Sequence, residues 1–292
     1  MTDLDIQILI QNILTANHFR EVVDIRNWKA TYRDMVRWLH PDRCTVDGSV
    51  NALIHLYQLR ETFEKGQQKQ DDAGKFRAKD KEAVYQGNLD LLKLSYNNFV
   101  NLKTRNDDAA RHFHRYLPTS MALTDKLSVR FQHRSIPLSG LELPQQHVLW
   151  ILSRLLECCA WFAQIDYVHG GINPESIYVV PKTHGIVFGS FYHFTKVGGR
   201  LKTISAKYKN WYPDAVFDTK RASTVIDLEL CKRTAAYLLG DTSGTGVKLL
   251  KTHHQAFINF LLDTHTNAFE CYDAYRKMLK QNFKRKFHEL KL

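Results

Sequence analysis

His40, Pro41 and Asp42 form a string of three residues in which two polar side chains flank a proline. The proline disfavours the helical conformation at His40 and supplies no backbone donor, so a helix arriving from the N-terminal side must stop near Leu39. The resulting turn orders both polar side chains before any partner binds. Cations precede the turn at steps of three or four residues, and solvated cations steer association more than they add affinity. They are Arg26, Lys29, Arg33 and Arg37.

The elements that position this turn are expected to be helices. Between residues 26 and 39, apolar residues recur on one helical face and the cations fall on another, which predicts an apolar inward side and a basic outward side. Apolar residues at helical spacing also predict helices over 4–14, 19–25 and 50–65. Gly66 is a natural C-terminal stop for the last of these. The first part of the chain is therefore predicted to be all-helical.

The segment 29–43, KATYRDMVRWLHPDR, resembles the second helix and the following loop of a J domain, the module of DnaJ-type co-chaperones. The context is specific, because the string ends a basic amphipathic helix, a short apolar helix precedes it and a capped helix follows. The resemblance implies recruitment of a DnaK-type heat-shock chaperone, whose ATP hydrolysis the loop triggers and whose acidic surface meets the basic helix. Carried over, the triggering residues are His40, Pro41 and Asp42, and the docking residues are Lys29, Arg33 and Arg37, with Arg26 a weaker candidate.

A second set of candidate residues lies in the segment 167–194, YVHGGINPESIYVVPKTHGIVFGSFYHF, which resembles the catalytic and metal-binding loops of a protein kinase. His169, Pro174 and Glu175 match the H-R-D-L-K-P-E-N pattern, and a long apolar helix predicted over 145–165 precedes them. The resemblance implies roles for three further positions. Pro213-Asp214 closes the activation segment, Asp227 is the buried aspartate that hydrogen-bonds the catalytic loop backbone, and Lys103 is the strand lysine that pairs with ATP phosphates.

The departures from the kinase pattern fall on the residues that carry chemistry. Phosphoryl transfer needs an aspartate as base, an asparagine and an aspartate on magnesium, and a glycine-rich loop over the phosphates. Without a carboxylate at either site, no group can hold the metal, so the resemblance predicts a catalytically inactive pseudokinase with no cofactor. The base position is Gly171, the adjacent lysine position Asn173 and the magnesium asparagine position Ser176; the D-F-G triplet reads Ser190-Phe191-Tyr192, and the loop keeps only Gly87.

Lys103 is expected to be a solvated strand residue. The acids in the helical stretch 107–116 are Asp107 and Asp108, which lie too near Lys103 in sequence to act as the usual glutamate partner. The retained residues His169, Pro174 and Asp227, together with Phe191, are those that bear the fold, so the domain keeps the scaffold of a kinase and loses its chemistry.

The fold class expected is α+β, with a small all-helical J domain followed by a bilobal kinase-like domain. Segment 83–102 alternates apolar and polar residues and predicts a β-hairpin, with a turn at Asn97-Asn98, that runs into a further strand. Strands are predicted over 176–180 and 185–188, and a helix over 225–239. The J domain, with a preceding N-terminal helix, is expected over 1–66, a polar linker over 67–81, a short β-rich N-lobe over 82–137 and a helical C-lobe over 138–292.

The charge of the chain is concentrated in two segments. The sequence carries 41 Lys and Arg against 30 Asp and Glu, a formal charge of +11. Segment 276–292 accounts for +6 and segment 196–209 for +5, so the rest of the chain is neutral. These segments favour an acidic partner or client protein for the second domain. Two alternatives remain open at this point, a nucleic-acid-binding scaffold with steeply salt-dependent affinity and an atypical kinase.

Composition excludes several classes of protein. With 44% hydrophobic residues the chain can build a core, and its longest apolar stretch, 147–168, is interrupted by charges that a membrane span would not tolerate. The start of the chain lacks the basic segment of a signal peptide, and the five cysteines show no C-x-x-C spacing. We therefore expect a soluble cytoplasmic protein with reduced thiols, no metal site and no membrane partner.

Overall fold

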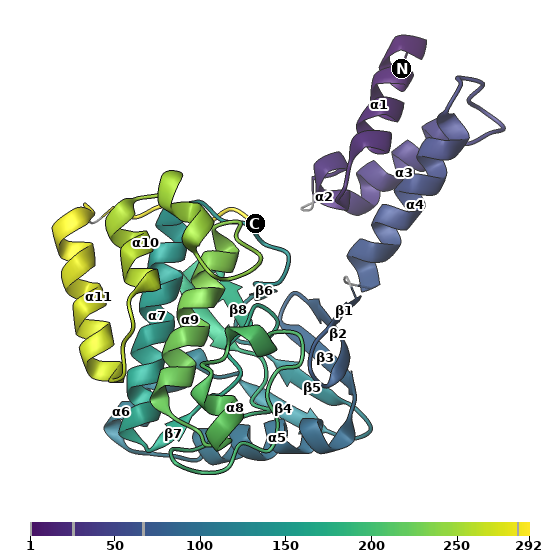
Figure 1. The fold of residues 1–292 in the computed structure, drawn as a ribbon. Coiled ribbons are helices and arrows are strands. Elements are labelled where there is room, and N and C mark those ends of the chain that lie inside the picture. The colour runs from purple at the N-terminus through teal and green to yellow at the C-terminus, as the bar shows by residue number, and fades with distance from the viewer. Residues whose placement is uncertain (1, 25–26, 66–67, 285) are drawn as a thin grey trace. The chain divides into compact units, whose positions relative to one another are not determined.

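The computed structural model describes residues 2–24, 27–65, 68–284 and 286–292, which divide into two compact units, Met1–Gln67 and Gln68–Leu292. In the described parts, the first unit is helical and the second mixes helices with sheets (Figure 1). The sequence boundary expected at Gly66 and Gln67 lies outside the described residues. None of the described helices has both the length and the apolar character that a membrane crossing requires.

The first unit confirms the predicted helices where the structure describes them, except that the helix predicted over 19–25 ends at Val22 and Val23 is extended. Its longest helix, α4, packs against each of the other three around a core that includes Ile13, Leu39 and Leu56. A capping box starts α1, in which the Thr2 side chain accepts from the amide of Asp5 and the Asp5 carboxylate accepts from the amide of Thr2. The helices are α1 (Asp3–Thr15), α2 (Phe19–Val22), α3 (Trp28–Leu39) and α4 (Ser49–Lys65).

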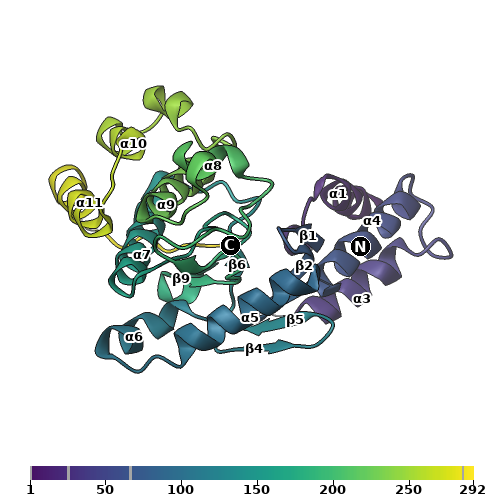
Figure 2. The same cartoon turned by 60° about the horizontal axis from the view of Figure 1, so that its bottom comes forward.

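A five-stranded antiparallel sheet opens the second unit, in the order β1-β2-β3-β5-β4. Helix α5 (Leu89–Lys103) connects β3 to the second half of the sheet and lies alongside β4 (Figure 2). Phe76 and Tyr85 are buried on facing positions of β2 and β3. The strands are β1 (Gln68–Gln70), β2 (Gly74–Lys79), β3 (Glu82–Gly87), β4 (Ser120–Leu123) and β5 (Leu127–Arg130).

The linker predicted over 67–81 is wrong where the structure describes it, because β1 and β2 lie there and belong to the sheet. These strands are hard to recognise from sequence, since β2 alternates one large buried residue, Phe76, with exposed Lys75 and Arg77. The segment is short and polar, and pairing with the rest of the sheet buries the few apolar residues it has.

The hairpin and further strand predicted over 83–102 are also wrong beyond Gly87. Strand β3 ends there and α5 begins, with the Asn88 side chain accepting from the amides of Asp90 and Leu91 as an N-cap. The predicted turn at Asn97-Asn98 lies in the middle of this helix. Apolar spacing at both two and four residues fits strand and helix alike, and the cap together with packing on the sheet selects the helix.

The remainder of the second unit is mainly helical, and α7, α9 and α11 pack side by side (Figure 1). The predicted helices at 145–165 and 225–239 are confirmed as α7 (Gln145–Gln164) and α9 (Thr224–Leu238), and the predicted strands as β8 (Ile177–Val180) and β9 (Gly185–Phe188). Helix α11 spans Ala268–Asn282, and the smaller elements are α6 (Asp108–Phe113), the 3-10 helix η1 (His114–Tyr116), β6 (Ile136–Pro137), β7 (Tyr167–Val168), β10 (Thr195–Lys196), α8 (Ala215–Thr219) and α10 (Gln255–Leu262).

Candidate functional site

The loop that follows α3 presents His40 and Asp42 to solvent. Their side chains are 48% and 84% exposed, and His40 Nδ1 lies 3.5 Å from Asp42 Oδ2. The backbone is held locally, because the amide of Asp42 donates to His40 Nδ1 at 3.3 Å and the amides of Arg43 and Cys44 donate to the His40 carbonyl at 2.9 Å. The turn is therefore ordered while its polar side-chain atoms stay accessible.

The three predicted docking cations lie on the exposed face of α3 that leads into this loop. Lys29, Arg33 and Arg37 are spaced by four residues and are all exposed, whereas the opposite face is buried. Arg37 pairs with Asp34 at 3.8 Å, an exposed contact that contributes little and leaves the cation available. Arg26, the weaker candidate, lies outside the described residues.

In the second unit, the segment 169–176, which we call the buried loop, is anchored by Asp227 in the first turn of α9. The Asp227 carboxylate accepts from the amide of His169 at 2.6 Å and from the amide of Gly170 at 2.8 Å. This is the contact with the loop backbone that the kinase resemblance implied for it. Burial raises the pKa of Asp227 to about 7, and the two backbone hydrogen bonds oppose that rise.

His169 is 1% exposed and both of its ring nitrogens are used inside the protein. Nδ1 accepts from the amide of Gly171 at 3.3 Å, so Nε2 carries the proton and donates to the Ser190 carbonyl at 2.9 Å. Burial lowers the pKa of His169 to about 3. The neutral imidazole therefore joins the buried loop to the segment that follows β9.

The side chains of Asn173 and Ser176 bond within the buried loop, whereas the Glu175 carboxylate accepts from Lys207 outside it. Asn173 Oδ1 accepts from the amides of Glu175 and Ser176, at 3.0 and 2.9 Å, and Ser176 Oγ accepts from the amide of Asn173 at 3.0 Å. Gly171 has no room for a side chain, because a Cβ there would lie 2.4 Å from Cδ2 of His193. Position 171 could not hold an aspartate unless His193 moved.

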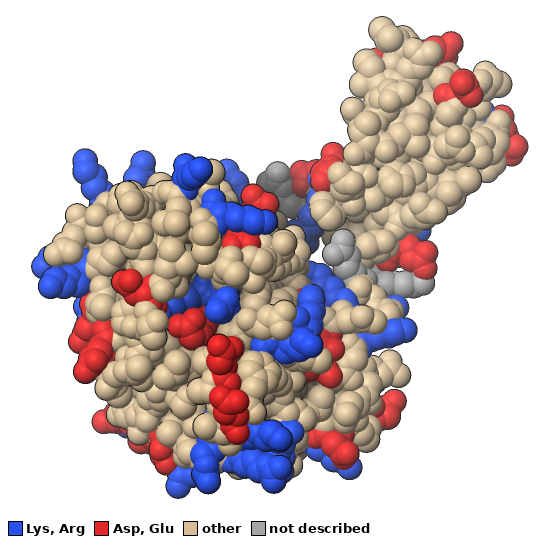
Figure 3. Space-filling view, viewed as in Figure 1, with Lys and Arg blue, Asp and Glu red and all other residues tan. Residues whose placement is uncertain are grey.

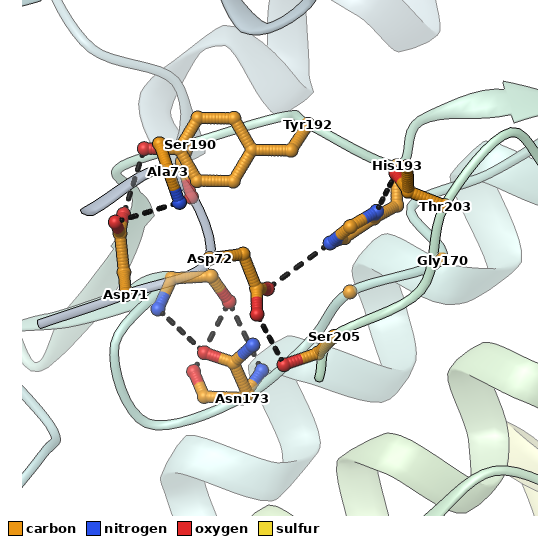
Figure 4. A network of polar contacts seen from close by, with 12 residues as sticks. Asp71, Asp72, Ala73, Gly170, Asn173, Ser190, Tyr192, His193, Thr203 and Ser205 are labelled. Atoms are coloured by element: carbon orange, nitrogen blue, oxygen red, sulfur yellow. Dashed lines mark hydrogen bonds and ion pairs between the residues drawn. The ribbon is translucent and has the colours of Figure 1, made fainter. Parts of the chain in front are cut away.

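The turn between β1 and β2, Asp71-Asp72, packs against the segment that follows β9 (Figure 4). Asp72 Oδ2 lies 3.0 Å from His193 Nε2, and Asp72 Oδ1 accepts from Ser205 Oγ at 2.8 Å. Asp71 accepts from the hydroxyl of Tyr192 at 2.7 Å. This acidic turn was not predicted from the sequence, because the turn falls in the segment taken for a linker. Its two adjacent carboxylates were the sequence feature that could have indicated it.

The pKa values of the two carboxylates of the acidic turn are shifted in opposite directions. Burial raises the pKa of Asp71 to about 6, although the hydrogen bond from Tyr192 opposes this. Burial would also raise the pKa of Asp72, but hydrogen bonds from His193 and Ser205 and the charge of His193 hold it below its ordinary value. Asp72 and His193 thus form a buried pair, with side chains 10% and 2% exposed.

Aromatic side chains fill the space between the sheet and β8. The hydroxyls of Tyr85 on β3 and Tyr178 on β8 lie 2.7 Å apart and are fully buried. A Cβ at Gly189 would lie 2.3 Å from the Tyr178 ring and 2.5 Å from the Tyr85 hydroxyl. This part of the interior is therefore tightly packed and leaves no space for a side chain at Gly189.

The strand assignment of Lys103 is wrong. It is the last residue of α5, and its Nζ donates to the Pro118 carbonyl at 3.1 Å rather than to any group of the buried loop. The residues of α5 that do reach the triplet region are Ser95, which accepts from the amide of Phe191, and Asn98, which donates to the Phe191 carbonyl. The only sequence signal for these two residues of α5 is their helical spacing, which places them on the same side of the helix as buried apolar residues.

The polar side chains around the buried loop are engaged with one another and with the backbone. Within the described residues, no group of three or more His, Cys, Asp and Glu side chains could hold a metal ion. The predicted positions His169, Gly171, Asn173, Ser176, Ser190 and Asp227 come together, whereas Lys103 does not join them.

No protein-family model matches this chain, and no curated protein matches it. Among solved structures, the chain is similar to one described as "Structure of vaccinia related kinase 3". The identity is 12%, the match covers 74% of this chain and 92% of that chain, and the TM-score is 0.45.

Proposed function

We propose that the protein is a J-domain co-chaperone that recruits a DnaK-type heat-shock chaperone and stimulates its ATPase, while a catalytically inactive kinase-like second unit binds a client or an acidic partner protein. The observation that carries this proposal is the exposed turn of His40 and Asp42, which adjoins three cations on one face of α3. Because they are exposed, these side chains contribute little to the stability of the first unit. An ordered turn lowers the entropic cost of binding, and the cations speed encounter with an acidic surface.

The inactive second unit is supported by three features of the buried loop. His193 fills the space beside Gly171, the position at which a kinase has its base. The side chains of Asn173 and Ser176 are bonded within the loop. Asp72 contacts His193 at 3.0 Å and holds its ring in this position.

The co-chaperone proposal is tested by the steady-state ATPase rate of a DnaK-type chaperone in the presence of the full chain. We expect the wild type to raise the rate and His40→Gln to lose most of the increase. His18→Gln is the matched control, because His18 is an exposed histidine of the same unit that makes no side-chain cap. Equal stimulation by His40→Gln and wild type, or no stimulation by wild type, would refute the proposal.

A thermal unfolding experiment with magnesium and ATP distinguishes the alternative of an atypical kinase from the proposed inactive unit. A ligand at about a hundred times its dissociation constant stabilises the folded state by about 2.7 kcal/mol. We expect no stabilisation of the second unit. A clear rise of its melting temperature that depends on both magnesium and ATP would favour a nucleotide-binding domain instead.

A second candidate function, binding of an acidic protein or nucleic acid, is favoured by the basic segment 196–209. Lys196 pairs with Asp166 and Lys207 with Glu175, whereas no ion pair of Arg200, Lys202 or Lys209 is found in the described part of the chain. Figure 3 shows cations mixed with acids over the visible face of this unit, with one group of cations at its lower edge beside α8. Binding to single-stranded RNA that weakens steeply with salt, and weakens further on changing the three residues to glutamine, would support nucleic acid.

A further inference from the structure

The second unit contains a cavity of about 530 Å³ that is separate from the buried loop. It lies between the end of α5, the η1 helix, the residues that follow β5, the middle of α7 and the turn between β8 and β9. Its volume is in the range of small-molecule sites, which are about 300–1,000 Å³. None of the residues of the buried loop lines it.

The lining of this cavity is cationic. It includes Lys103, Arg115 and Arg154 and no Asp or Glu. Arg154 donates to Glu157 at 3.2 Å, whereas neither Lys103 nor Arg115 forms an ion pair in the part of the chain that the structure describes. A partly buried ammonium group without a carboxylate is costly, so this arrangement favours an anion as ligand.

Lys103 and Arg115 are each held in place by a backbone carbonyl. The Lys103 ammonium donates to the Pro118 carbonyl at 3.1 Å, and burial lowers the pKa of Lys103. The Arg115 guanidinium donates to the His112 carbonyl at 2.9 Å and lies 3.2 Å from His112 Nδ1. Both cations are therefore positioned in advance, which reduces the conformational entropy that a ligand must remove.

The same cavity has an apolar part. Tyr116, Phe131 and Ile186 are buried residues that line it, and His184, another lining residue, has a shielded Nε2 without a hydrogen-bond partner in the described structure. An inorganic phosphate ion is much smaller than the cavity and would leave this lining uncovered. A ligand with both an anionic group and a ring would use the whole site.

We propose that this cavity binds a small organic phosphate, with its phosphate at Lys103 and Arg115 and its organic part against Tyr116 and Phe131. Lysine and arginine are the usual side-chain partners of phosphate groups, and charge-assisted hydrogen bonds are about twice as strong as neutral ones. The proposal does not depend on the co-chaperone function, because none of its residues belongs to the first unit.

The test measures binding of phenyl phosphate and of inorganic phosphate to the full chain by calorimetry, in buffer that contains EDTA. We expect saturable binding of both, with phenyl phosphate about tenfold tighter because its ring buries apolar surface. Lys103→Gln should weaken phenyl phosphate about tenfold through loss of a charged hydrogen bond. Arg111→Gln, the matched control, should change affinity less than about twofold, because exposed Arg111 pairs with Asp108 and does not line the cavity.

Melting curves without ligand show whether each variant folds, and Arg115→Gln replaces Lys103→Gln if the latter does not. Absence of saturable phenyl phosphate binding to the wild type would overturn the proposal. Equal weakening by Arg111→Gln and Lys103→Gln would also overturn it, because it would show a general effect of surface charge rather than a defined site.

Discussion

Two histidines in this protein make the same local contact in opposite surroundings. The amide of Asp42 donates to His40 Nδ1 and the amide of Gly171 donates to His169 Nδ1, in both cases two residues along the chain and at 3.3 Å. The side chain of His40 is 48% exposed, whereas His169 is 1% exposed and gives its second nitrogen to the Ser190 carbonyl. The turn is alike, and burial decides whether the imidazole stabilises the fold or remains available to a partner.

The same difference applies to the aspartates of the two loops. Asp42 is 84% exposed and, among the residues that the structure describes, contacts only its own turn, whereas Asp227 is 2% exposed and accepts two backbone hydrogen bonds. Loss of a buried acceptor leaves donors without partners, which costs more than loss of an exposed one. Substitutions in the buried loop should therefore act on stability, and substitutions at residues 40–42 should act on partner binding.

The largest effect is expected from Asp227→Ala. It leaves the buried amides of His169 and Gly170 without an acceptor and should lower the free energy of unfolding of the second unit by about 4 kcal/mol. Urea unfolding monitored by circular dichroism measures this loss. Asp218→Ala, at an exposed position in α8, is the control. A loss below about 1 kcal/mol would mean that other contacts hold the buried loop.

Asp72→Ala should come next, with a loss of about 3 kcal/mol. It removes the carboxylate that faces His193 and Ser205, both of which stay buried. Asp72→Asn keeps one acceptor oxygen and should lose less. Hydrogen exchange at residues 71–74 should accelerate in the alanine variant, and unchanged exchange would show that the acidic turn is fixed without this pair.

A smaller effect depends on pH. The pKa of His169 is about 3 in the folded protein, below its ordinary value of 6.5, so the unfolded chain binds the proton first as the pH falls. His169 thus contributes stability above about pH 6.5 that is lost as the pH falls towards 3, by up to about 1.4 kcal/mol per pH unit. The stability difference between wild type and His169→Gln should shrink from pH 7 to pH 4.5.

Urea titrations of both proteins at several pH values measure that difference. Asp227 acts with the opposite sign, since its pKa is raised to about 7 and its contribution to stability falls as the pH rises towards that value. Because both proteins contain Asp227, its effect cancels in the comparison. A difference that does not vary with pH would contradict a neutral buried His169.

The smallest effect on stability is expected from Asp42→Ala. An exposed side chain with only local contacts should change the free energy of unfolding of the first unit by less than about 0.5 kcal/mol. The same variant should lose stimulation of the chaperone ATPase under the proposed function. A loss of stability above about 1 kcal/mol would contradict the expected difference between Asp42 and Asp227. A variant that stimulates the chaperone ATPase fully would show that other residues trigger the hydrolysis.

Much of the fold was predictable where neighbours in sequence decide the structure. The stop of α3 before Pro41 and the cationic face of Lys29, Arg33 and Arg37 follow from proline sterics and helical spacing, and the structure shows both. The helices α7 and α9 were found for the same reason. The errors fell at β2 and α5, where short or ambiguous periodicity is resolved only by what each segment packs against.

The sequence by itself gave the basis for predicting an inactive kinase-like site, since the prediction rests on the residue types at Gly171, Ser176 and Ser190. Tertiary structure alone decided that Asp72 meets His193, 121 residues away, that Lys103 lines a cationic cavity, and that His169 is buried while His40 is exposed. Spacing along the chain fixes local backbone geometry over a few residues. Burial and long-range pairing depend on how distant segments fold against one another, which local spacing does not encode.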